Sequence, residues 1–274
     1  MDARAALSAF LQRHRRLMVL TGAGCSAPSG IPDYRDRDGG WKHSKPMTLA
    51  EFIGSAAARR RYWAGSLRGW PRVRDARPNP AHDALARLEC RGRIARLVTQ
   101  NVDGLHQKAG TRGVVDLHGR LDRVDCLECG GQVSREDVQR LLAAWNPGLV
   151  GTHGAGVDGE VRPDGDSSWS RPDTELRIPD CPQCGGVLKP GVVFFGESVP
   201  RERVRDASAA IADADALLVV GSSLMVYSGY RFVRAAVERG IEVAAVNLGR
   251  TRADAELSLK VEADCAALLA ELVA

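Results

Sequence analysis

A glycine turn followed by alternating prolines is the feature that most constrains this 274-residue chain. The turn comes after the apolar run Leu17 to Leu20, whose length and composition are typical of a buried parallel strand. Gly22, Gly24 and Ala27 match the G-x-G-x-x-G/A pattern, in which the first glycine makes a tight turn and the second lets the backbone approach a pyrophosphate. Strand and turn together predict an α/β fold that binds a dinucleotide.

The residues after this turn do not continue as the helix that usually follows it. Pro28, Gly30 and Pro32 occupy alternate positions, and proline inside a helix removes a backbone donor and clashes with the preceding turn. We therefore predict a loop from Pro28 to about Trp41 that folds over the bound nucleotide. An ordinary dehydrogenase lacks such a loop.

Five further apolar runs are predicted to be strands of the same sheet, with helical periodicity between them. This alternation predicts an α/β, Rossmann-like doubly wound parallel sheet, with ligands beyond the carboxyl ends of the strands. The predicted strands are Ala95 to Thr99, Val114 to Leu117, Val192 to Phe195, Leu217 to Val220 and Val243 to Val246. The predicted helices are Pro80 to Leu88, Arg201 to Ala214, Tyr230 to Arg239 and Ala263 to Leu272.

Two stretches interrupt the alternation. Residues 50–78 mix arginines with Tyr62, Trp63 and Trp70; such a stretch can grip phosphates, but the pattern favours a solvated helical face over a small aromatic core. The second stretch, 125–186, surrounds a predicted loop, 146–172, that is rich in Gly, Pro, Asp and Ser. We predict a large Rossmann-like part at about 1–48, 79–124 and 187–274, and a small module at about 49–78 (helical) and 125–186 (metal-binding).

Two Cys-x-x-Cys pairs, each followed by two glycines, predict a zinc site. The two-residue gap lets both thiolates point at one ion while backbone amides of the turn donate to the sulfurs, and two such knuckles complete a tetrahedral four-sulfur shell. Four protein ligands leave no open position, so the zinc is expected to be structural. A redox pair or chance pairing is the alternative. The predicted ligands are Cys126, Cys129, Cys181 and Cys184.

Composition excludes several classes of protein. Apolar residues make up 44% and charged residues 26% of the chain, which is ordinary for a soluble globular protein. The net charge of +4 is mild, so no dedicated nucleic-acid site is expected. No run approaches the roughly 18 apolar residues of a membrane-spanning helix. The chain has seven cysteines and no evident secretion signal, which favours metal binding over disulfides. The same observations favour a cytoplasmic location.

Polar residues follow two of the predicted strands. Gln100, Asn101 and Asp103 come after one strand and face the glycine turn; Asn101 or Asp103 could alternatively cap the next helix. His118 ends another strand, a position suited either to a general base or to a structural role. The other five histidines carry no signal beyond surface or packing roles.

These motifs, in this order along nearly the whole chain, resemble the sirtuin family. The stretches 78–82, 188–190 and 226–232 look most like its class II branch. The motifs are Gly22 to Ser26, Gly30 to Arg35, Thr99 to Asp103, Leu117 to Gly119, the two cysteine pairs, Val193 to Glu197, Gly221 to Leu224 and Val246 to Gly249.

The resemblance implies a single sirtuin-type catalytic domain over 1–274 that acts as an NAD-dependent protein-lysine deacetylase or deacylase. Sirtuins cleave NAD at its nicotinamide bond and move the acyl group of an acyl-lysine to ADP-ribose. They release lysine, nicotinamide and O-acyl-ADP-ribose. The implied cofactors are NAD, consumed as co-substrate, and one structural zinc; the implied partners are acyl-lysine proteins, with the enzyme a monomer.

The resemblance also assigns residues. His118 would activate a ribose hydroxyl once the acyl oxygen has attacked the anomeric carbon, and Asn101 would position the nicotinamide ribose and a water. Substrate backbone would pair with Val193, Phe194, Phe195, Gly196 and Glu197. The implied NAD contacts are Gly22, Ala23, Gly24, Ser26, Ile31, Asp33, Tyr34, Arg35, Gln100, Asn101, Asp103, Gly221, Ser222, Ser223, Asn247, Leu248, Gly249 and Cys265.

The chain departs from the family pattern at a few positions. Cys25 replaces a usual aliphatic residue and is expected to be a small packing residue rather than an oxidation-sensitive thiol. Gly191 stands where class II members commonly carry Asp. The Tyr-x-x-Arg pair that grips acidic acyl groups is missing, since Gly65 follows Tyr62, which disfavours succinyl-lysine. Alternative readings are a mono-ADP-ribosyltransferase of the same fold, a non-catalytic zinc and nucleic-acid module, and a hydride-transferring dehydrogenase.

Overall fold

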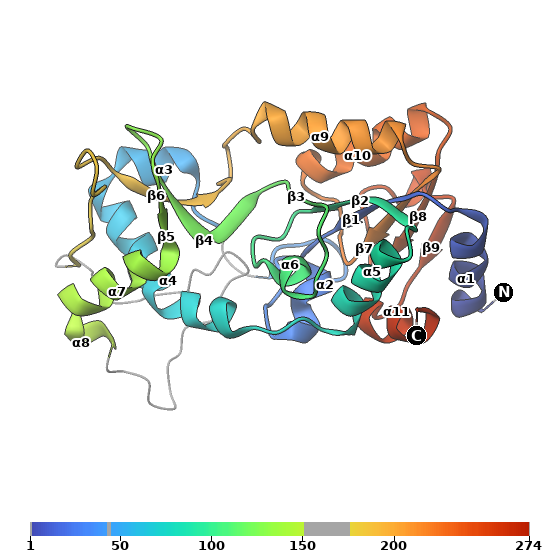
Figure 1. Ribbon diagram of the computed structural model, residues 1–274, viewed down its shortest axis with the longest axis horizontal. Helices are drawn as coiled ribbons and strands as arrows, with labels where there is room; N and C mark the ends of the chain where they lie inside the picture. The colour runs from blue at the N-terminus through green and yellow to red at the C-terminus, as the bar shows by residue number, and fades with distance from the viewer. Residues whose placement is uncertain (1, 43–44, 151–175, 274) are drawn as a thin grey trace. The chain divides into compact units, whose positions relative to one another are not determined.

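The protein, described here by a computed structural model, divides into two compact units (Figure 1). The structure describes residues 2–42, 45–150 and 176–273. Unit 1 comprises Met1–Ser44, Ala76–His118 and Val199–Ala274, and unit 2 comprises Lys45–Asp75 and Gly119–Ser198. This division places 119–124 and 187–198 in the smaller unit, whereas the sequence assigned them to the large part. The prediction of one catalytic domain stays a prediction.

Unit 1 is built on a parallel sheet with the strand order β3-β2-β1-β7-β8-β9. The order reverses between β1 and β7, which is the switch point where ligands bind in doubly wound sheets. β1 and β7 are buried at every position, as the continuous apolar runs predicted. The strands are β1 Leu17–Thr21, β2 Ile94–Thr99, β3 Val114–Asp116, β7 Ala216–Val220, β8 Glu242–Val246 and β9 Leu259–Val261.

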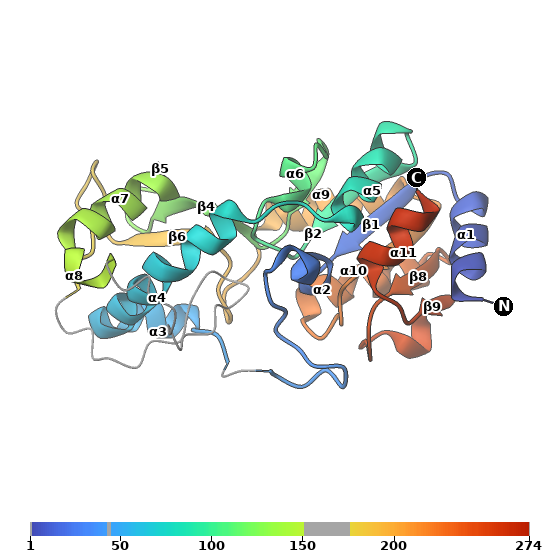
Figure 2. The same cartoon turned by 90° about the horizontal axis from the view of Figure 1, so that it is seen from below.

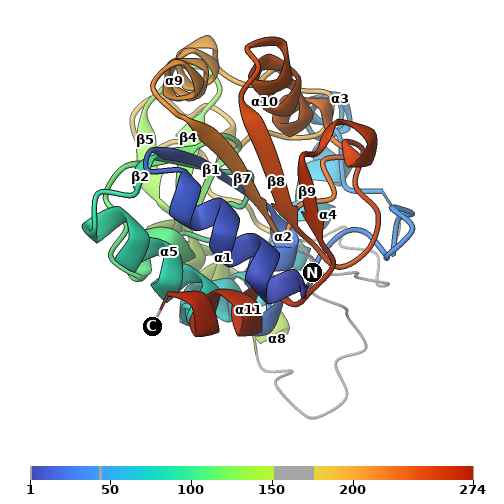
Figure 3. The same cartoon turned by 90° about the vertical axis from the view of Figure 1, so that its right-hand side faces the viewer.

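Helices cover both faces of this sheet, as Figure 3 shows in an end-on view. On one face α1 Ala3–Arg13, α5 Pro80–Cys90 and α11 Cys265–Leu272 pack into a core with Leu17 and Val19. On the other, α9 Arg201–Ala212 and α10 Tyr227–Glu238 pack with Met18 and Leu20. Successive β1 side chains thus serve opposite cores. The predicted doubly wound α/β fold is confirmed.

Short elements complete unit 1. They are α2 Ala23–Ser26, the 3₁₀ turn Ala27–Ser29, α6 Leu105–Lys108 and a second 3₁₀ turn, Asp254–Glu256. The helical turn after the glycines thus ends at Ser29, and no helix follows it up to Lys42 (Figure 2). The prediction that no long helix follows the turn is confirmed, although the loop begins at Gly30 rather than at Pro28. That the loop folds over a nucleotide stays a prediction.

Unit 2 contains a three-stranded antiparallel sheet in the order β5-β4-β6. Its core is aromatic: Phe52, Tyr62 and Phe194 lie in mutual ring contact, and Trp63 is fully buried. The arginine-rich stretch is therefore a helical face over an aromatic core, as the sequence favoured. The elements are α3 Leu49–Gly54, α4 Ala56–Asp75, β4 Gly119–Cys126, β5 Gln132–Ser134, α7 Arg135–Trp145, α8 Pro147–Val150 and β6 Leu188–Val192.

One predicted strand of the parallel sheet is wrong. Val192 ends β6, which pairs antiparallel with β4, and residues 193–195 leave that sheet. The apolar run marked a buried segment, but its pairing partner was the polar strand β4, which periodicity did not reveal.

Of the predicted loop 146–172, residues 151–172 lie outside the described residues, as do His43 and His153. No described helix is both long and apolar enough to cross a membrane.

Candidate active site

The glycine turn packs backbone to backbone against the end of β7. Gly22 N donates to Val220 O at 3.1 Å, and Gly24 N donates to Gly221 O at 2.9 Å. A Cβ on Gly221 would lie 2.2 Å from Cys25 N, and its φ of +60° also requires glycine. A Cβ on Gly22 would lie 2.7 Å from Ser222 Cβ. The three glycines therefore allow the two strand ends to approach at the switch point of the sheet, as a dinucleotide cradle requires.

Asn101 and Asp103 form one hydrogen-bonded network with the glycine turn. Asn101 Nδ2 donates to Gly22 O and to Ser26 Oγ, both at 3.0 Å, and Ser26 Oγ donates to Asp103 Oδ2 at 2.7 Å. Asp103 Oδ1 also accepts from Leu105 N at 2.9 Å, so the cap and the site contact coexist. Burial raises the pKa of Asp103. The structure thus brings Ser26, Asn101 and Asp103 together, as predicted.

Gln100 and His118 belong to a second hydrogen-bonded group beside this network. Ser222 Oγ donates to Gln100 Oε1 at 2.7 Å. His118 Nδ1 lies 3.0 Å from Gln100 O, and His118 Nε2 lies 2.8 Å from Ser228 Oγ. Burial lowers the pKa of His118 to about 4, against a smaller opposing effect of the Gln100 carbonyl. The imidazole is therefore neutral at pH 7 and has a lone pair with which to accept a proton.

The loop after the glycine turn is held in a defined shape. The guanidinium of Arg35 lies 3.4 Å from the centre of the Trp41 ring and donates to Gly39 O at 3.1 Å. Asp33 forms an ion pair with Lys42, and Tyr34 meets Trp41 edge to face. Arg250 N donates to Arg37 O at 2.7 Å, which ties the loop to the chain after β8. Ile31 is buried at the start of the loop.

The residues predicted at the adenosine end follow β8 or begin α11. Asn247 Nδ2 donates to Leu248 O and Gly249 O at 3.2 and 3.3 Å, which shapes the turn after β8. Cys265 Sγ lies 3.7 Å from Gly24 O. The Cys265 contact brings the start of α11 against the turn after β1. The roles of these residues in NAD binding stay predictions.

The structure also brings together three buried residues beneath this site, of which the sequence singled out only Cys25. Cys25, His82 and His106 offer ligand atoms within 4.8 Å of one another. His82 Nδ1 accepts from Asn79 N at 3.3 Å and caps α5, while His106 Nε2 lies 2.9 Å from Thr21 Oγ1. Burial lowers the pKa of His82 to about 4, and that of His106 well below its usual value. Only the fold brings these residues together, since they lie on α2, α5 and α6.

Cys25 also contacts Cys265. A hydrogen bond with Cys265, followed by burial, raises the pKa of the Cys25 thiol. Cys25 is fully buried, so it is the packing residue that the sequence favoured.

The predicted substrate segment, 193–197, lies in unit 2. Phe194 N and Lys189 Nζ both donate to Glu197 Oε2, at 2.8 and 3.2 Å. Phe195 O accepts from Leu49 N at 3.0 Å, whereas the Phe194 side chain is buried in the aromatic core. Gly191, the other departure, lies in β6, and a Cβ there would meet Arg123 Cβ at 3.1 Å. Gly191 therefore lies in β6, opposite an irregularity in the pairing of β6 with β4.

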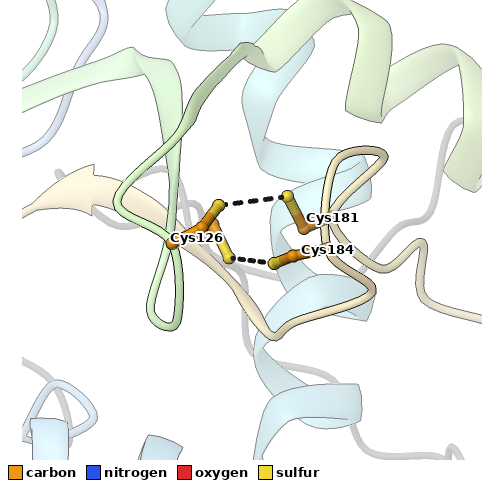
Figure 4. A group of neighbouring side chains, drawn as sticks. Cys126, Cys181 and Cys184 are labelled. Atoms are coloured by element: carbon orange, nitrogen blue, oxygen red, sulfur yellow. Dashed lines mark hydrogen bonds between the residues drawn. The ribbon is translucent and has the colours of Figure 1, made fainter.

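The four predicted zinc ligands converge from two loops of unit 2, and Figure 4 shows the sulfurs of Cys126, Cys181 and Cys184 meeting. The Sγ atoms of Cys126 and Cys184 lie 3.5 Å apart, and those of Cys129 and Cys181 lie 3.7 Å apart. A tetrahedral zinc with bonds of about 2.3 Å separates its sulfurs by about 3.8 Å. All four sulfurs lie within 4.8 Å of one another, so they fit a structural zinc.

The two knuckles are built alike. Gly130 N donates to Cys126 O and Gly185 N donates to Cys181 O, and both glycines adopt a left-handed φ, +69° and +74°. Gly131 N donates to Cys129 Sγ at 3.4 Å. The glycine after each cysteine pair therefore allows the tight turn, and amides point at the sulfurs as predicted.

Comparison with known proteins decides the family. The family model "Sir2 family" matches residues 22–228. The chain belongs to the Sir2 family. It is 57% identical over 268 residues, 97% of this chain and 90% of the relative, to an NAD-dependent protein deacetylase of Xanthomonas campestris pv. campestris (strain 8004). It is 49% identical over 252 residues, 90% of this chain and 80% of the relative, to NAD-dependent protein deacylase SIR4 of Monosiga brevicollis.

Solved structures of the same family share the fold. A complex of Sir2 with p53 peptide and NAD+ aligns with a TM-score of 0.79 and 30% identity, covering 99% of this chain and 97% of that one. Sir2 bound to acetylated peptide aligns with a TM-score of 0.78, 30% identity and the same coverage. The sirtuin resemblance is confirmed at the level of the family, whereas membership of the class II branch stays a prediction.

Proposed function

We propose that this sirtuin is an NAD-dependent protein-lysine deacetylase that cleaves NAD and releases nicotinamide and O-acyl-ADP-ribose. The observation that carries the proposal is His118: a half-buried, neutral imidazole that follows β3 at the carboxyl edge of the parallel sheet and is held by Gln100 O. The names of the relatives and the peptide complexes of the structural neighbours support the same reaction. Acylated proteins are the proposed partners.

The contacts support distinct roles for the residues around the turn. His118 would take the proton of a ribose hydroxyl, and Asn101, which is already fixed to Gly22 and Ser26, would orient the nicotinamide ribose and a water. Asp103 and Ile31 would hold the nicotinamide amide. Gln100 would support the base through its carbonyl oxygen.

The remaining contacts would divide between cofactor, substrate and metal. The loop with Tyr34 and Arg35 would exclude water from the reacting centre. Residues 193–197 would pair with the substrate backbone. Zinc at the four cysteines would hold the small sheet together and would supply no chemistry. The four-cysteine cluster favours a compartment in which thiols stay reduced, so the proposed location is the cytoplasm.

The test compares two histidine variants, His118→Ala and His14→Ala. His14 is a matched control because it contacts Glu242 on the surface of unit 1. With an acetyl-lysine peptide and NAD, we expect His118→Ala to lower O-acyl-ADP-ribose formation by about 10²–10⁴-fold, the usual worth of a general base. His14→Ala should retain the wild-type rate. Mass spectrometry counts acyl loss and ADP-ribose gain separately.

Two results would contradict the proposal. Unchanged product formation in His118→Ala would remove this residue from the chemistry. ADP-ribose gained by protein without loss of acyl groups would identify the chain as a mono-ADP-ribosyltransferase.

A further inference from the structure

Ser228 contacts the proposed base from a distant part of the chain. It lies in the first turn of α10, 110 residues after His118, and its Oγ lies 2.8 Å from His118 Nε2. Gln100 O lies 3.0 Å from the other ring nitrogen, Nδ1. Both nitrogens of the imidazole therefore have a partner in unit 1, and the ring is fixed from two sides.

The chemistry of these partners fixes the tautomer of His118. A carbonyl oxygen only accepts hydrogen bonds, so Nδ1 must carry the proton that it donates to Gln100 O. In the neutral ring Nε2 then carries the lone pair, and Ser228 Oγ–H is the donor to it. The hydroxyl of Ser228 thus lies on the one nitrogen that can act as a base.

The next residue explains how α10 comes close enough. A Cβ on Gly229 would lie 2.5 Å from Gln100 Nε2, so glycine lets this helical turn pack against Gln100 without displacing its side-chain amide. Because Ser228 lies in a helical turn, its backbone is fixed, and its short side chain contacts His118 Nε2 directly. The start of α10 thus contacts His118 through Ser228 and lies against the Gln100 side chain at Gly229.

We propose that Ser228 is a positioning residue for His118, whose hydroxyl holds the Nε2 lone pair in place until a substrate hydroxyl takes over that hydrogen bond. This inference rests on the proposed role of His118 as the base of a deacylation. An imidazole nitrogen has one in-plane lone pair, so the two hydroxyls use it in turn. Ser228 fixes the orientation of the ring before the substrate hydroxyl arrives. The entropy cost of orienting the base is therefore not added to the activation barrier.

The experiment separates two steps of the proposed reaction. Exchange of labelled nicotinamide into NAD, with acyl peptide present, reports the first step, which precedes proton removal by His118. O-acyl-ADP-ribose formation reports the later step. We expect Ser228→Ala to slow O-acyl-ADP-ribose formation by about tenfold, the worth of one hydrogen bond, and to leave nicotinamide exchange unchanged. Ser208→Ala, on the exposed side of α9, is the matched control and should match the wild type in both.

The pH profile gives a second readout. The Ser228 hydroxyl donates to the neutral ring, so its removal favours the protonated form, and the acid limb of kcat/KM for NAD should move to higher pH. Ser228→Thr keeps the hydroxyl and should restore both the rate and the profile.

Three results would overturn the inference. The first is Ser228→Ala with wild-type rates and profile. The second is an equal loss of exchange and product formation with an unchanged profile, which would mean a purely structural role. The third is Ser228→Thr as slow as Ser228→Ala. If the wild-type enzyme itself forms no O-acyl-ADP-ribose, the proposed function fails instead, so the two failures are distinguishable.

Discussion

At the scale of single residues, the site depends on groups whose charge the protein controls. Burial lowers the pKa of His118 to about 4, so the ring is neutral and the proposed base is available throughout the physiological pH range. The sequence predicted where His118 lies because strand ends are readable from apolar runs. It did not predict Ser228 or the Gln100 carbonyl as partners, because contacts across the chain depend on how the strands are ordered.

Local chemistry was readable at other single positions. Asp103 was predicted either to cap a helix or to face the glycine turn, and its two oxygens do both. His82 and His106 gave no signal, because a histidine buried between two helices has no distinctive neighbours in the sequence. The departure at Cys25 was visible, but its contact with Cys265 was not.

The glycine of the β7 turn allows a prediction with a matched control. Gly221 and Gly240 both have a left-handed φ, +60° and +70°, but only at Gly221 would a Cβ meet backbone. We expect Gly240→Ala to lower the free energy of unfolding by about 1 kcal/mol, the cost of the backbone conformation. Gly221→Ala should cost about 1–3 kcal/mol more, because Cys25 N must move. Urea unfolding measures both, and equal losses would show that the close packing does not matter.

At the scale of elements, apolar runs predicted the central strands and the turn chemistry predicted the loop and the knuckles. β1, β7 and most of β8 are buried, so their sequences are continuous apolar runs that indicate strands. β4 alternates polar and buried positions and β9 has only three residues, so neither stood out. The same gap led to the wrong assignment of residues 192–195, whose partner strand was not seen.

The zinc knuckles allow a prediction at this scale. Cys184→Ser removes one of four ligands, and zinc binding is worth on the order of 10 kcal/mol in small zinc domains. We expect the variant to lose its zinc and to melt at a lower temperature, as unit 2 loses the link between its two knuckles. Cys90→Ser is the control, since Cys90 is an exposed free cysteine at the end of α5. A Cys184→Ser protein with full zinc content and unchanged melting would refute the assignment.

At the scale of the whole molecule, buried histidines should make stability depend on pH. The pKa values of His82 and His118 are about 4 in the folded protein, below the ordinary value of about 6.5 that they regain on unfolding. The unfolded chain therefore binds more protons between pH 6.5 and 4, and stability is lost as the pH falls through this window. Asp103, whose pKa burial raises, acts in the opposite sense.

We expect each of these two histidines to remove about 3 kcal/mol of unfolding free energy between pH 6.5 and 4. Urea unfolding at several pH values measures the loss, and His118→Gln should make it shallower by one histidine's share. A stability that is flat from pH 7 to 4 would contradict the burial of these rings.

That the protein is a monomer stays a prediction.

The strand order of unit 1 delays the completion of its sheet during synthesis on the ribosome. β1 ends at Thr21, but its neighbour β7 begins only at Ala216, after every residue of unit 2 has been made. At about 5–20 residues per second, the nascent chain waits roughly 10–40 s with one edge of β1 unpaired. Throughout that interval Gly22 and Gly24 lack their partners at Val220 and Gly221. The dinucleotide cradle is therefore among the last parts of the enzyme to form, and a growing chain with an exposed apolar strand is a natural client for chaperones.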